Sequence, residues 1–318
     1  MKALIIGSGA VGCAIAIATV KAGMETSLIA RSDTAEYIRK NGLKRVGIFG
    51  EETVLPGTVS VFEDYGQIPS DQDFIVITVK TMSNEIVAEE LNAHPDIVGK
   101  NGRLIILQNG WGVNEHYLKA FPDSRIFNAR VMTGFERVSK GTTRITVHKA
   151  PLLIGSLYGQ SVEGLLPLTR AISASGIASE TTDELEQALW AKMLYNTTLN
   201  PLGAILNMSY GELSESPNLV NIMNDLIEET FRVMNAAGYK TYWDNAHEYR
   251  EVLYNNLIPD TYSHHSSTLQ DIQNHQKTEI DTLNGCIQRI GRENGIATPT
   301  HDMIVSMIRG IEDICCRD

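Results

Sequence analysis

The chain begins with a short apolar segment that runs directly into a glycine-rich turn. Residues 2–6 predict a strand, residues 10–22 predict a helix, and a GxGxxG pattern joins them. The turn consists of Gly7, Ser8, Gly9, Ala10, Val11 and Gly12. In this setting the glycines permit a tight turn, close approach of a pyrophosphate and close helix packing. Because a helix amino end attracts anions, the turn is a candidate dinucleotide-binding site; a turn that binds nothing is the alternative.

The end of the second predicted strand indicates which dinucleotide binds. That strand covers residues 25–30, and Arg31 follows it where NAD-dependent enzymes carry an Asp or Glu for the ribose hydroxyls. A carboxylate would repel a 2′-phosphate, whereas a guanidinium binds it through paired, charged hydrogen bonds. The sequence therefore favours NADP(H) over NAD(H). Lys80, just beyond another predicted strand, would add a second cation, or else is an ordinary solvated lysine.

Strands and helices alternate through the first half of the chain. They comprise strands at 74–79 and 103–108 and helices near 83–93 and 113–121. This alternation predicts an α/β domain with a doubly wound, Rossmann-type sheet. Residues 43–61 predict an antiparallel hairpin inserted at one edge of that sheet, and residues 141–155 predict two more antiparallel strands that close it.

The character of the chain changes near residue 183. Strand-like runs vanish and long segments with helical periodicity follow, at 184–207, 217–237, 242–256 and 278–294. We therefore expect an NADP-binding domain over residues 1–182 and a mostly α-helical substrate and catalytic domain over residues 183–318. The joint between them is short and polar, which favours a fixed cleft between the domains.

Charge and composition exclude several classes of function. A formal net charge of −11 without clustered Lys and Arg argues against nucleic-acid binding. No run reaches roughly 18 consecutive apolar residues, so we expect no membrane span, and glycines interrupt the apolar start, which argues against a signal peptide. The cysteines lack CxxC or metal-ligand spacing, so we expect no metal site and reduced thiols in a cytoplasmic protein: Cys13, Cys286, Cys315 and Cys316.

One predicted helix carries a row of polar residues in otherwise apolar surroundings. Lys192, Asn196 and Asn200 are spaced at i, i+4 and i+8, so they stack along one helix face. Flanking residues such as Trp190 and Leu194 direct much of this helix toward a core. We therefore expect the row to line a polar cleft; exposure to solvent is the alternative.

A second polar cluster surrounds Ser267 and Glu279. If the chain between them were one straight helix, they would lie about 18 Å apart and could not bind one small substrate. Thr278 with Asp281 resembles an N-terminal helix cap. The pattern therefore predicts a turn near 274–277 and a new helix from Glu279 that folds back beside Ser267.

These residues together make the chain resemble the ketopantoate reductase (2-dehydropantoate 2-reductase) family over nearly its whole length. The matching parts are the turn at 7–12, Arg31, Lys80, QNG at 108–110, KxxxNxxxNPL at 192–202 and SSxxQD…KTEIDxxNG at 266–285. The last two motifs are specific, whereas glycine turns are common. The resemblance implies a Rossmann-type domain followed by a helical domain of the 6-phosphogluconate dehydrogenase C-terminal type.

The resemblance also implies roles for individual residues. Lys192 would be the general acid, and Glu279 would hold the substrate and contact the cofactor. The residues implied in binding substrate are Asn109, Asn196, Asn200 and Ser267, and Asn109 also belongs to the implied cofactor site. Hydride reduction of a ketone creates an alkoxide, which needs a nearby proton donor. An ammonium group supplies both the proton and a positive charge.

Three departures from the family pattern surround the expected substrate pocket. His264 replaces an expected asparagine, Thr268 a usual methionine and Gln276 a common basic residue. Reaction type is therefore better defined than substrate.

The sequence predicts NADPH-dependent reduction of an α-keto acid, 2-dehydropantoate, to pantoate for pantothenate and coenzyme A biosynthesis. A homodimer is compatible with it. The alternatives are a related NADP-dependent reductase or dehydrogenase of another 2-oxo or 3-hydroxy acid, and a non-catalytic NADP(H)-sensing protein.

Overall fold

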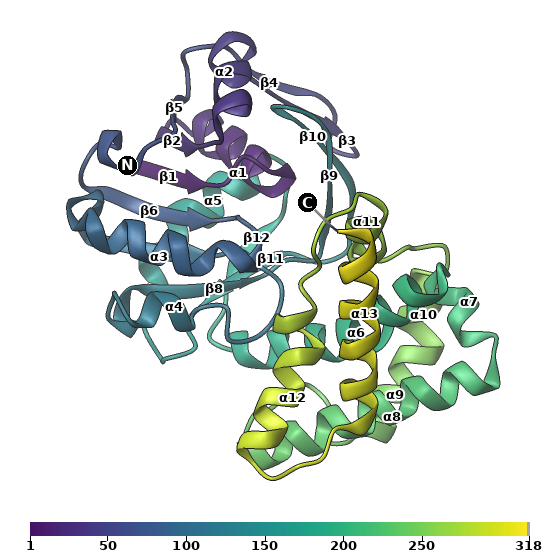
Figure 1. The fold of residues 1–318 in the computed structure, drawn as a ribbon. Coiled ribbons are helices and arrows are strands. Elements are labelled where there is room, and N and C mark those ends of the chain that lie inside the picture. Colours follow the sequence, from purple (N-terminus) through teal and green to yellow (C-terminus); the bar gives the residue numbers. More distant parts are fainter. Residues whose placement is uncertain (317–318) are drawn as a thin grey trace. The chain divides into compact units, whose positions relative to one another are not determined.

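The computed structural model describes residues 1–316, and the chain forms two compact units (Figure 1). The first contains Met1–Gln108 and Val113–Leu185. The second contains the short segment Asn109–Gly112 together with the described chain from Glu186 onward. The predicted domain boundary between residues 182 and 183 stays a prediction, because compactness alone does not show that a unit folds independently.

The first unit is built on an eight-stranded sheet. Its strands are β1 (Lys2–Ile6), β2 (Glu25–Ile29), β5 (Ser60–Phe62), β6 (Gln72–Ile77), β7 (Val98–Ile106), β8 (Ile126–Arg130), β11 (Leu152–Gly155) and β12 (Ser179–Thr181). Their order across the sheet is β12-β11-β8-β7-β6-β1-β2-β5, and only β8 and β11 pair antiparallel. The chain winds outward in both directions from β1 and β6. The predicted doubly wound fold is confirmed.

Helices cover both faces of this sheet. Successive residues of β1 point to opposite faces, so Ala3 and Ile5 join the core under α1 (Ala10–Lys21), while Leu4 and Ile6 join the other core. The other helices of the unit are α2 (Ser32–Asn41), α3 (Asn84–Ala93), α4 (Glu115–Leu118) and α5 (Leu166–Ala174). Burial on both faces explains the continuous apolar runs in the central strands β1 and β6.

A second, four-stranded sheet covers the outer side of α1. It contains β3 (Leu43–Gly47), β4 (Glu52–Val54), β9 (Thr133–Ser139) and β10 (Thr142–His148), in the order β4-β3-β10-β9. Because α1 packs on β1 and β2 as well as on β3 and β10, its residues 12–19 are all buried. A helix that is apolar all round is the expected result of such packing.

This second sheet corrects two predictions. The hairpin predicted within residues 43–61 forms as β3 and β4, but it lies in the separate sheet instead of at an edge of the main one. Of the two strands predicted within residues 141–155, β11 joins the main sheet and β10 does not. The reason is the parallel pairing of β3 with β10, which joins segments far apart in sequence and leaves no local pattern.

The second unit is helical. Its helices are α6 (Leu185–Leu206), α7 (Tyr210–Ser214), α8 (Pro217–Ala237), α9 (Ala246–Val252), α10 (Ile258–Asp260), α11 (Ser267–Gln273), α12 (Asn284–Glu293) and α13 (Pro299–Cys315). One apolar core joins them, with Trp190, Leu226, Ile287 and Ile304 among its buried members. The predicted helical character of this part of the chain is confirmed.

Helix ends in the second unit differ from the predictions where the backbone changes its winding. The helix predicted at 242–256 begins at Ala246 and continues into a π-helical turn, Leu253–Leu257. The helix predicted at 278–294 begins only at Asn284, because a 3₁₀ turn, Ile280–Thr282, precedes it. The chain does turn at 274–277, where His275 adopts a positive φ of 57°.

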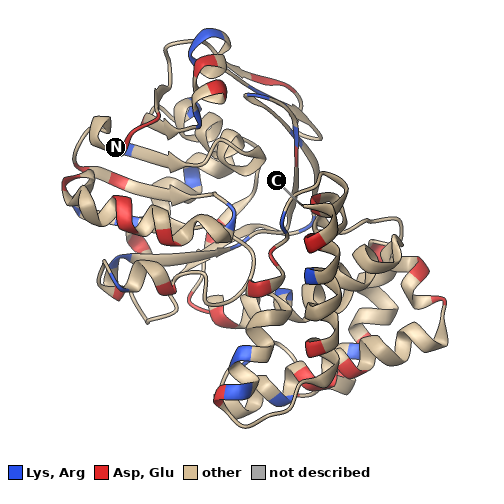
Figure 2. Cartoon of the chain, viewed as in Figure 1, with Lys and Arg blue, Asp and Glu red and all other residues tan. Residues whose placement is uncertain are grey.

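Charged residues are spread over the helices and sheets of each unit, with both signs interspersed (Figure 2). Among residues 1–316, no helix combines the length and apolar character that a membrane crossing requires. The same part of the chain brings together no group of three or more His, Cys, Asp or Glu side chains suited to a metal ion.

Candidate active site

The glycine turn is shaped by steric limits on its backbone. Gly7 has a φ of 113°, a conformation that favours glycine, and its N–H donates to the Ile29 carbonyl at 3.2 Å. A Cβ on Gly12 would lie 1.8 Å from the Gly7 carbonyl oxygen, so α1 could not pack there with any larger residue. By contrast, a Cβ on Gly9 would meet nothing within 4 Å. The turn is therefore closed on its inner side and open at Gly9.

The amino end of α1 is suited to an anion. Gly9 is the N-cap residue and offers no side-chain hydrogen bond, and the first turn of α1, which starts with Ala10 and Val11, carries no acidic residue. The backbone N–H groups of this end thus lack a side-chain acceptor and a competing negative charge. Ser8 contributes its carbonyl, which accepts from the Cys13 thiol at 3.4 Å. These residues fit a pyrophosphate, although its binding stays a prediction.

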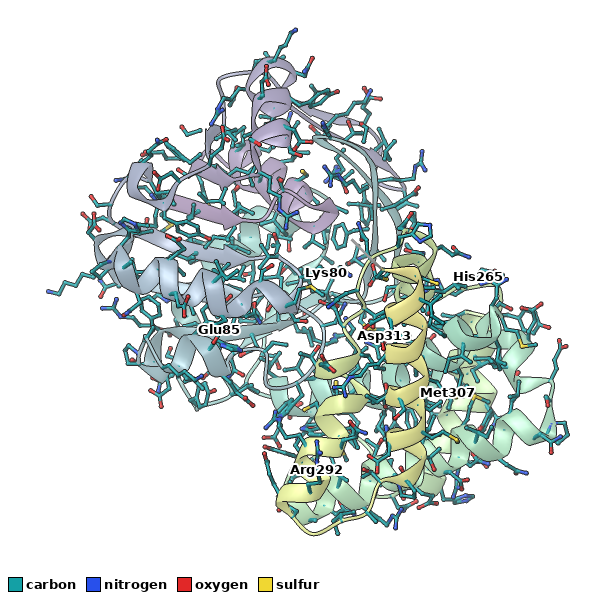
Figure 3. The ribbon with its side chains drawn as sticks, viewed as in Figure 1. Lys80, Glu85, His265, Arg292, Met307 and Asp313 are labelled. Atoms are coloured by element: carbon teal, nitrogen blue, oxygen red, sulfur yellow. The ribbon has the colours of Figure 1, made fainter. Side chains whose placement is uncertain are left out.

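Two cations follow strands of the same sheet at their carboxyl ends. Arg31 is exposed and immediately precedes α2. Lys80, labelled in Figure 3, is exposed and follows β6. Asp33, in the first turn of α2, forms an ion pair with Lys140 at 2.7 Å, and this hydrogen bond lowers the pKa of the Asp33 carboxyl. An acidic neighbour of Arg31 is thereby neutralised. The arrangement suits a terminal phosphate near Arg31.

The second unit gathers three of the predicted residues around the side-chain amide of Asn109. Lys192 donates from Nζ to Asn109 Oδ1 at 2.6 Å, and Asn109 Nδ2 donates to Glu279 Oε2 at 3.3 Å. Lys192 and Glu279 are both half-buried. The Asn109 amide therefore orients both charged groups: its oxygen accepts from the Lys192 ammonium, and its nitrogen donates to the Glu279 carboxylate.

The segment that carries Asn109 is anchored to the second unit by its neighbours. The N–H of Trp111 donates to the Thr282 carbonyl at 3.0 Å, and the Trp111 ring lies 5.0 Å from Trp190 and 4.8 Å from Tyr239, between ring centroids. Gly110 has a φ of 102°, and a Cβ there would lie 2.5 Å from the Thr282 carbonyl oxygen. Asn109 is thus held beside Lys192 by contacts on either side of Gly110.

The other predicted α6 residues differ in their partners. Asn200 Oδ1 accepts from Tyr210 Oη at 2.7 Å, and the Asn200 carbonyl accepts from Ser266 Oγ at 3.0 Å. Asn196 is 8% exposed, and its side chain makes no hydrogen bond within residues 1–316. Ser267 is exposed at the start of α11, whereas its neighbour Ser266 is fully buried. Whether Ser267 and Glu279 reach one substrate stays a prediction.

A proline inside α6 is compensated from another helix. Pro201 has no N–H, so the Thr197 carbonyl one turn earlier loses its normal helical donor. Asn284 Nδ2 donates to that carbonyl at 2.9 Å and lies 3.1 Å from His301 Nδ1. His301 Nε2 lies 3.1 Å from the Leu226 carbonyl, so the ring is neutral with its proton on Nε2. Complete burial lowers the pKa of His301 to about 4.

Several residues of this site escaped the sequence analysis. Tyr210 and Thr282 belong to no helical or strand periodicity that leads to Asn200 or Asn109. Asn284 stands within the motif at 266–285, but only the structure connects it with Pro201. His264, one of the three departures, supplies the carbonyl that accepts from the Tyr210 N–H at 3.1 Å.

Models of one protein family match both parts of the chain. The model described as ketopantoate reductase PanE/ApbA matches residues 3–159, and its C-terminal counterpart matches residues 184–312. The chain belongs to the ketopantoate reductase family. Among curated members, it is similar to a 2-dehydropantoate 2-reductase of Aquifex aeolicus, with 34% identity over 98% of this chain and 97% of that protein.

Solved structures of the ketopantoate reductase family share the fold. A PanE/ApbA family ketopantoate reductase from Ralstonia eutropha superimposes with a TM-score of 0.85 and 30% identity, covering 98% of this chain and 99% of that one. A D-mandelate dehydrogenase in complex with NADH and anilino(oxo)acetate gives a TM-score of 0.84 at 24% identity, over 98% and 99% of the two chains. The latter similarity concerns the fold alone.

Proposed function

We propose that this protein catalyses the NADPH-dependent reduction of 2-dehydropantoate to pantoate, in the cytoplasm, as a step of pantothenate and coenzyme A biosynthesis. The observation that carries the proposal is the Lys192 ammonium, which the Asn109 amide holds together with Glu279 in a member of the ketopantoate reductase family. The 2-dehydropantoate 2-reductases that share its full length support the substrate.

Lys192 would be the general acid of the reaction. As the substrate ketone is reduced, its oxygen gains negative charge and then a proton. An ammonium within hydrogen-bond reach stabilises that charge and supplies the proton. The Asn109 oxygen, which accepts from Nζ, would hold the ammonium in place before the substrate arrives. Glu279 would fix the opposite end of the Asn109 amide and bind the substrate or the cofactor.

The remaining polar residues would bind the substrate beside the reacting carbon. Asn196 offers an amide that makes no hydrogen bond within residues 1–316, and Asn200 lies one turn farther along the same helix face. Ser267 would add a hydroxyl and a backbone N–H at the start of α11. Neutral donors of this kind suit a carboxylate or hydroxyl of a keto acid.

The first unit would hold NADPH, which supplies the hydride when bound. Its pyrophosphate would meet the backbone of the turn at 7–12, where Gly9 leaves open space. Arg31 would bind the 2′-phosphate, and Lys80 would add positive charge at the carboxyl end of β6. Each of these residues follows a strand end at the edge where doubly wound sheets bind their ligands.

A panel of 2-oxo and 3-hydroxy acids tests this function. Each acid would be incubated with purified protein and saturating NADPH or NADP⁺, and turnover followed at the nicotinamide absorbance. We expect 2-dehydropantoate to give the highest kcat/KM. Turnover with another acid but not with 2-dehydropantoate would refute the substrate and leave the reaction class. Tight NADPH binding without any turnover would instead identify a sensing protein. A homodimer stays a prediction, which sedimentation equilibrium would test.

A further inference from the structure

Tyr210 is a buried tyrosine whose hydroxyl contacts the side-chain amide of Asn200. It opens α7, and its hydroxyl donates to Asn200 Oδ1 at 2.7 Å. The residue is 2% exposed, so it has almost no surface with which to touch a substrate directly. Burial also raises the pKa of Tyr210 well above its ordinary value, so the phenol keeps the proton that it donates to Asn200 Oδ1.

An asparagine amide has two different ends, and the environment decides which one faces a ligand. The oxygen accepts hydrogen bonds, whereas the nitrogen donates them. With Oδ1 committed to Tyr210, the Nδ2 end of Asn200 is directed elsewhere. Asn200 Nδ2 makes no hydrogen bond within residues 1–316, yet it does not belong to the fully buried polar atoms that lack a partner. It is therefore an accessible donor.

The Tyr210 hydroxyl is itself held by its surroundings. The Tyr210 N–H donates to the His264 carbonyl at 3.1 Å, and the two rings lie 5.1 Å apart. The ring of Tyr195, a residue of α6, packs edge-on against the Tyr210 ring, with 5.5 Å between the ring centroids. Ser209 closes the amino end of α7 through a reciprocal cap with Glu212. The phenol thus meets Asn200 from a rigid position.

We propose that Tyr210 is a positioning residue for the substrate, which acts by orienting Asn200 so that its amide N–H₂ group, and not its carbonyl oxygen, faces the anionic keto acid. This inference rests on the proposed function, in which Asn200 binds substrate. A rotated amide would present an oxygen to a carboxylate and weaken binding. Tyr210 therefore selects an anionic or hydrogen-bond-accepting group at this end of the α6 row.

Tyr210→Phe removes only the hydroxyl, and Tyr195→Phe is its matched control. Tyr195 Oη pairs with Thr261 Oγ1 at 2.7 Å instead of with Asn200, so its loss leaves the amide untouched. We expect Tyr210→Phe to raise the KM for the keto acid about tenfold, with kcat and the KM for NADPH within about twofold of wild type. Tyr195→Phe should change each of these constants less than about twofold. Equal effects of the two variants would overturn the inference.

A double-mutant cycle separates an effect through Asn200 from a direct one. In an Asn200→Ala background, Tyr210→Phe should no longer raise the KM, because no amide remains to be oriented. A full additional increase there would contradict the proposed route. If the wild type reduces no acid of the panel, the proposed function fails. If the wild type reduces an acid of the panel, and Asn200→Ala raises the KM for that acid while Tyr210→Phe leaves it unchanged, the proposed function stands and only this inference fails.

Asn200→Asp gives a second test that does not depend on the folding of the Tyr210 variant. The aspartate keeps an oxygen for the Tyr210 hydroxyl but places a second oxygen where Nδ2 stood. We expect a KM for the keto acid several times higher than that of Asn200→Ala, because the carboxylate repels an anionic substrate. A KM equal to that of the wild type would show that Nδ2 does not face the substrate.

Discussion

The glycine turn at 7–12 and the Lys192 cluster, which consists of Lys192, Asn109 and Glu279, are formed by different kinds of atoms. The turn uses backbone atoms of residues adjacent in sequence, and its side chains matter chiefly by their absence. The Lys192 cluster uses side-chain atoms, and the hydrogen bonds that Asn109 makes to Lys192 and Glu279 join residues 83 and 170 positions apart. A backbone site therefore depends on local sterics, whereas a side-chain site depends on the tertiary structure that brings its members together.

The largest effect should follow from breaking the side-chain site at Lys192. Lys192→Ala removes the proposed proton donor, and we expect kcat to fall about a thousandfold, as for loss of a general acid. The Kd for NADPH, measured by fluorescence titration, should change less than about threefold. Lys240→Ala, at an exposed lysine of the same unit, is the control. A kcat close to wild type in Lys192→Ala would remove this residue from the chemistry.

A smaller effect should follow from removing Arg31, the cation that follows the second strand of the glycine-turn unit. Arg31→Ala removes the proposed partner of the 2′-phosphate, so the Kd for NADPH should rise by about 10- to 100-fold. The Kd for NADH, which lacks that phosphate, should stay within about threefold. Lys40→Ala, an exposed position on α2, controls for general loss of positive charge. Equal weakening of both nucleotides would contradict the phosphate assignment.

Substitutions of two glycines in this turn should have different effects, one on stability and the other on NADPH affinity. Gly12→Ala forces a Cβ against the Gly7 carbonyl, so we expect a loss of about 1–3 kcal/mol in the free energy of unfolding. Gly9→Ala meets open space, so stability should be unchanged while the Kd for NADPH rises. Urea denaturation and nucleotide titration of both variants measure this. Full NADPH affinity in Gly9→Ala would show that no phosphate approaches there.

The smallest effect should follow from removing the contact that stabilises α6 at Pro201. Asn284→Ala leaves the Thr197 carbonyl without a donor, which should cost about 1–2 kcal/mol of unfolding free energy. Pro201→Ala restores a backbone N–H to that carbonyl, so Asn284→Ala should cost less in this background. Urea denaturation of the four proteins gives the coupling. Additive effects would mean that Asn284 does not compensate for the proline.

The sequence predicts features that depend on short-range regularities. The turn at 7–12 and Arg31 could be recognised because strand, turn, helix and strand follow one another within residues 2–31. The row of Lys192, Asn196 and Asn200 could be placed on one face because helical periodicity fixes it. The chain turns at 274–277 as predicted, but the helix that Thr278 and Asp281 were expected to cap begins only at Asn284, so the capping pattern was wrong about the helix start.

The remaining features depend on contacts that no local pattern encodes. The sheet that holds β3 and β10 was misplaced because these strands pair in parallel across a long sequence separation. Likewise, nothing in the spacing of Tyr210 or Asn284 points to Asn200 or Thr197. The roles of the predicted site residues stay predictions, which the variants above will decide.

The membership of Asn109–Gly112 in the second unit has a consequence for protein engineering. A recombinant fragment that starts at residue 183 would contain the whole of α6 but would lack the Asn109 amide that accepts from Lys192. It would also lack Trp111, whose ring packs against Trp190 and Tyr239. Exchange of helical halves between relatives should therefore transfer residues 109–112 from the same parent as α6.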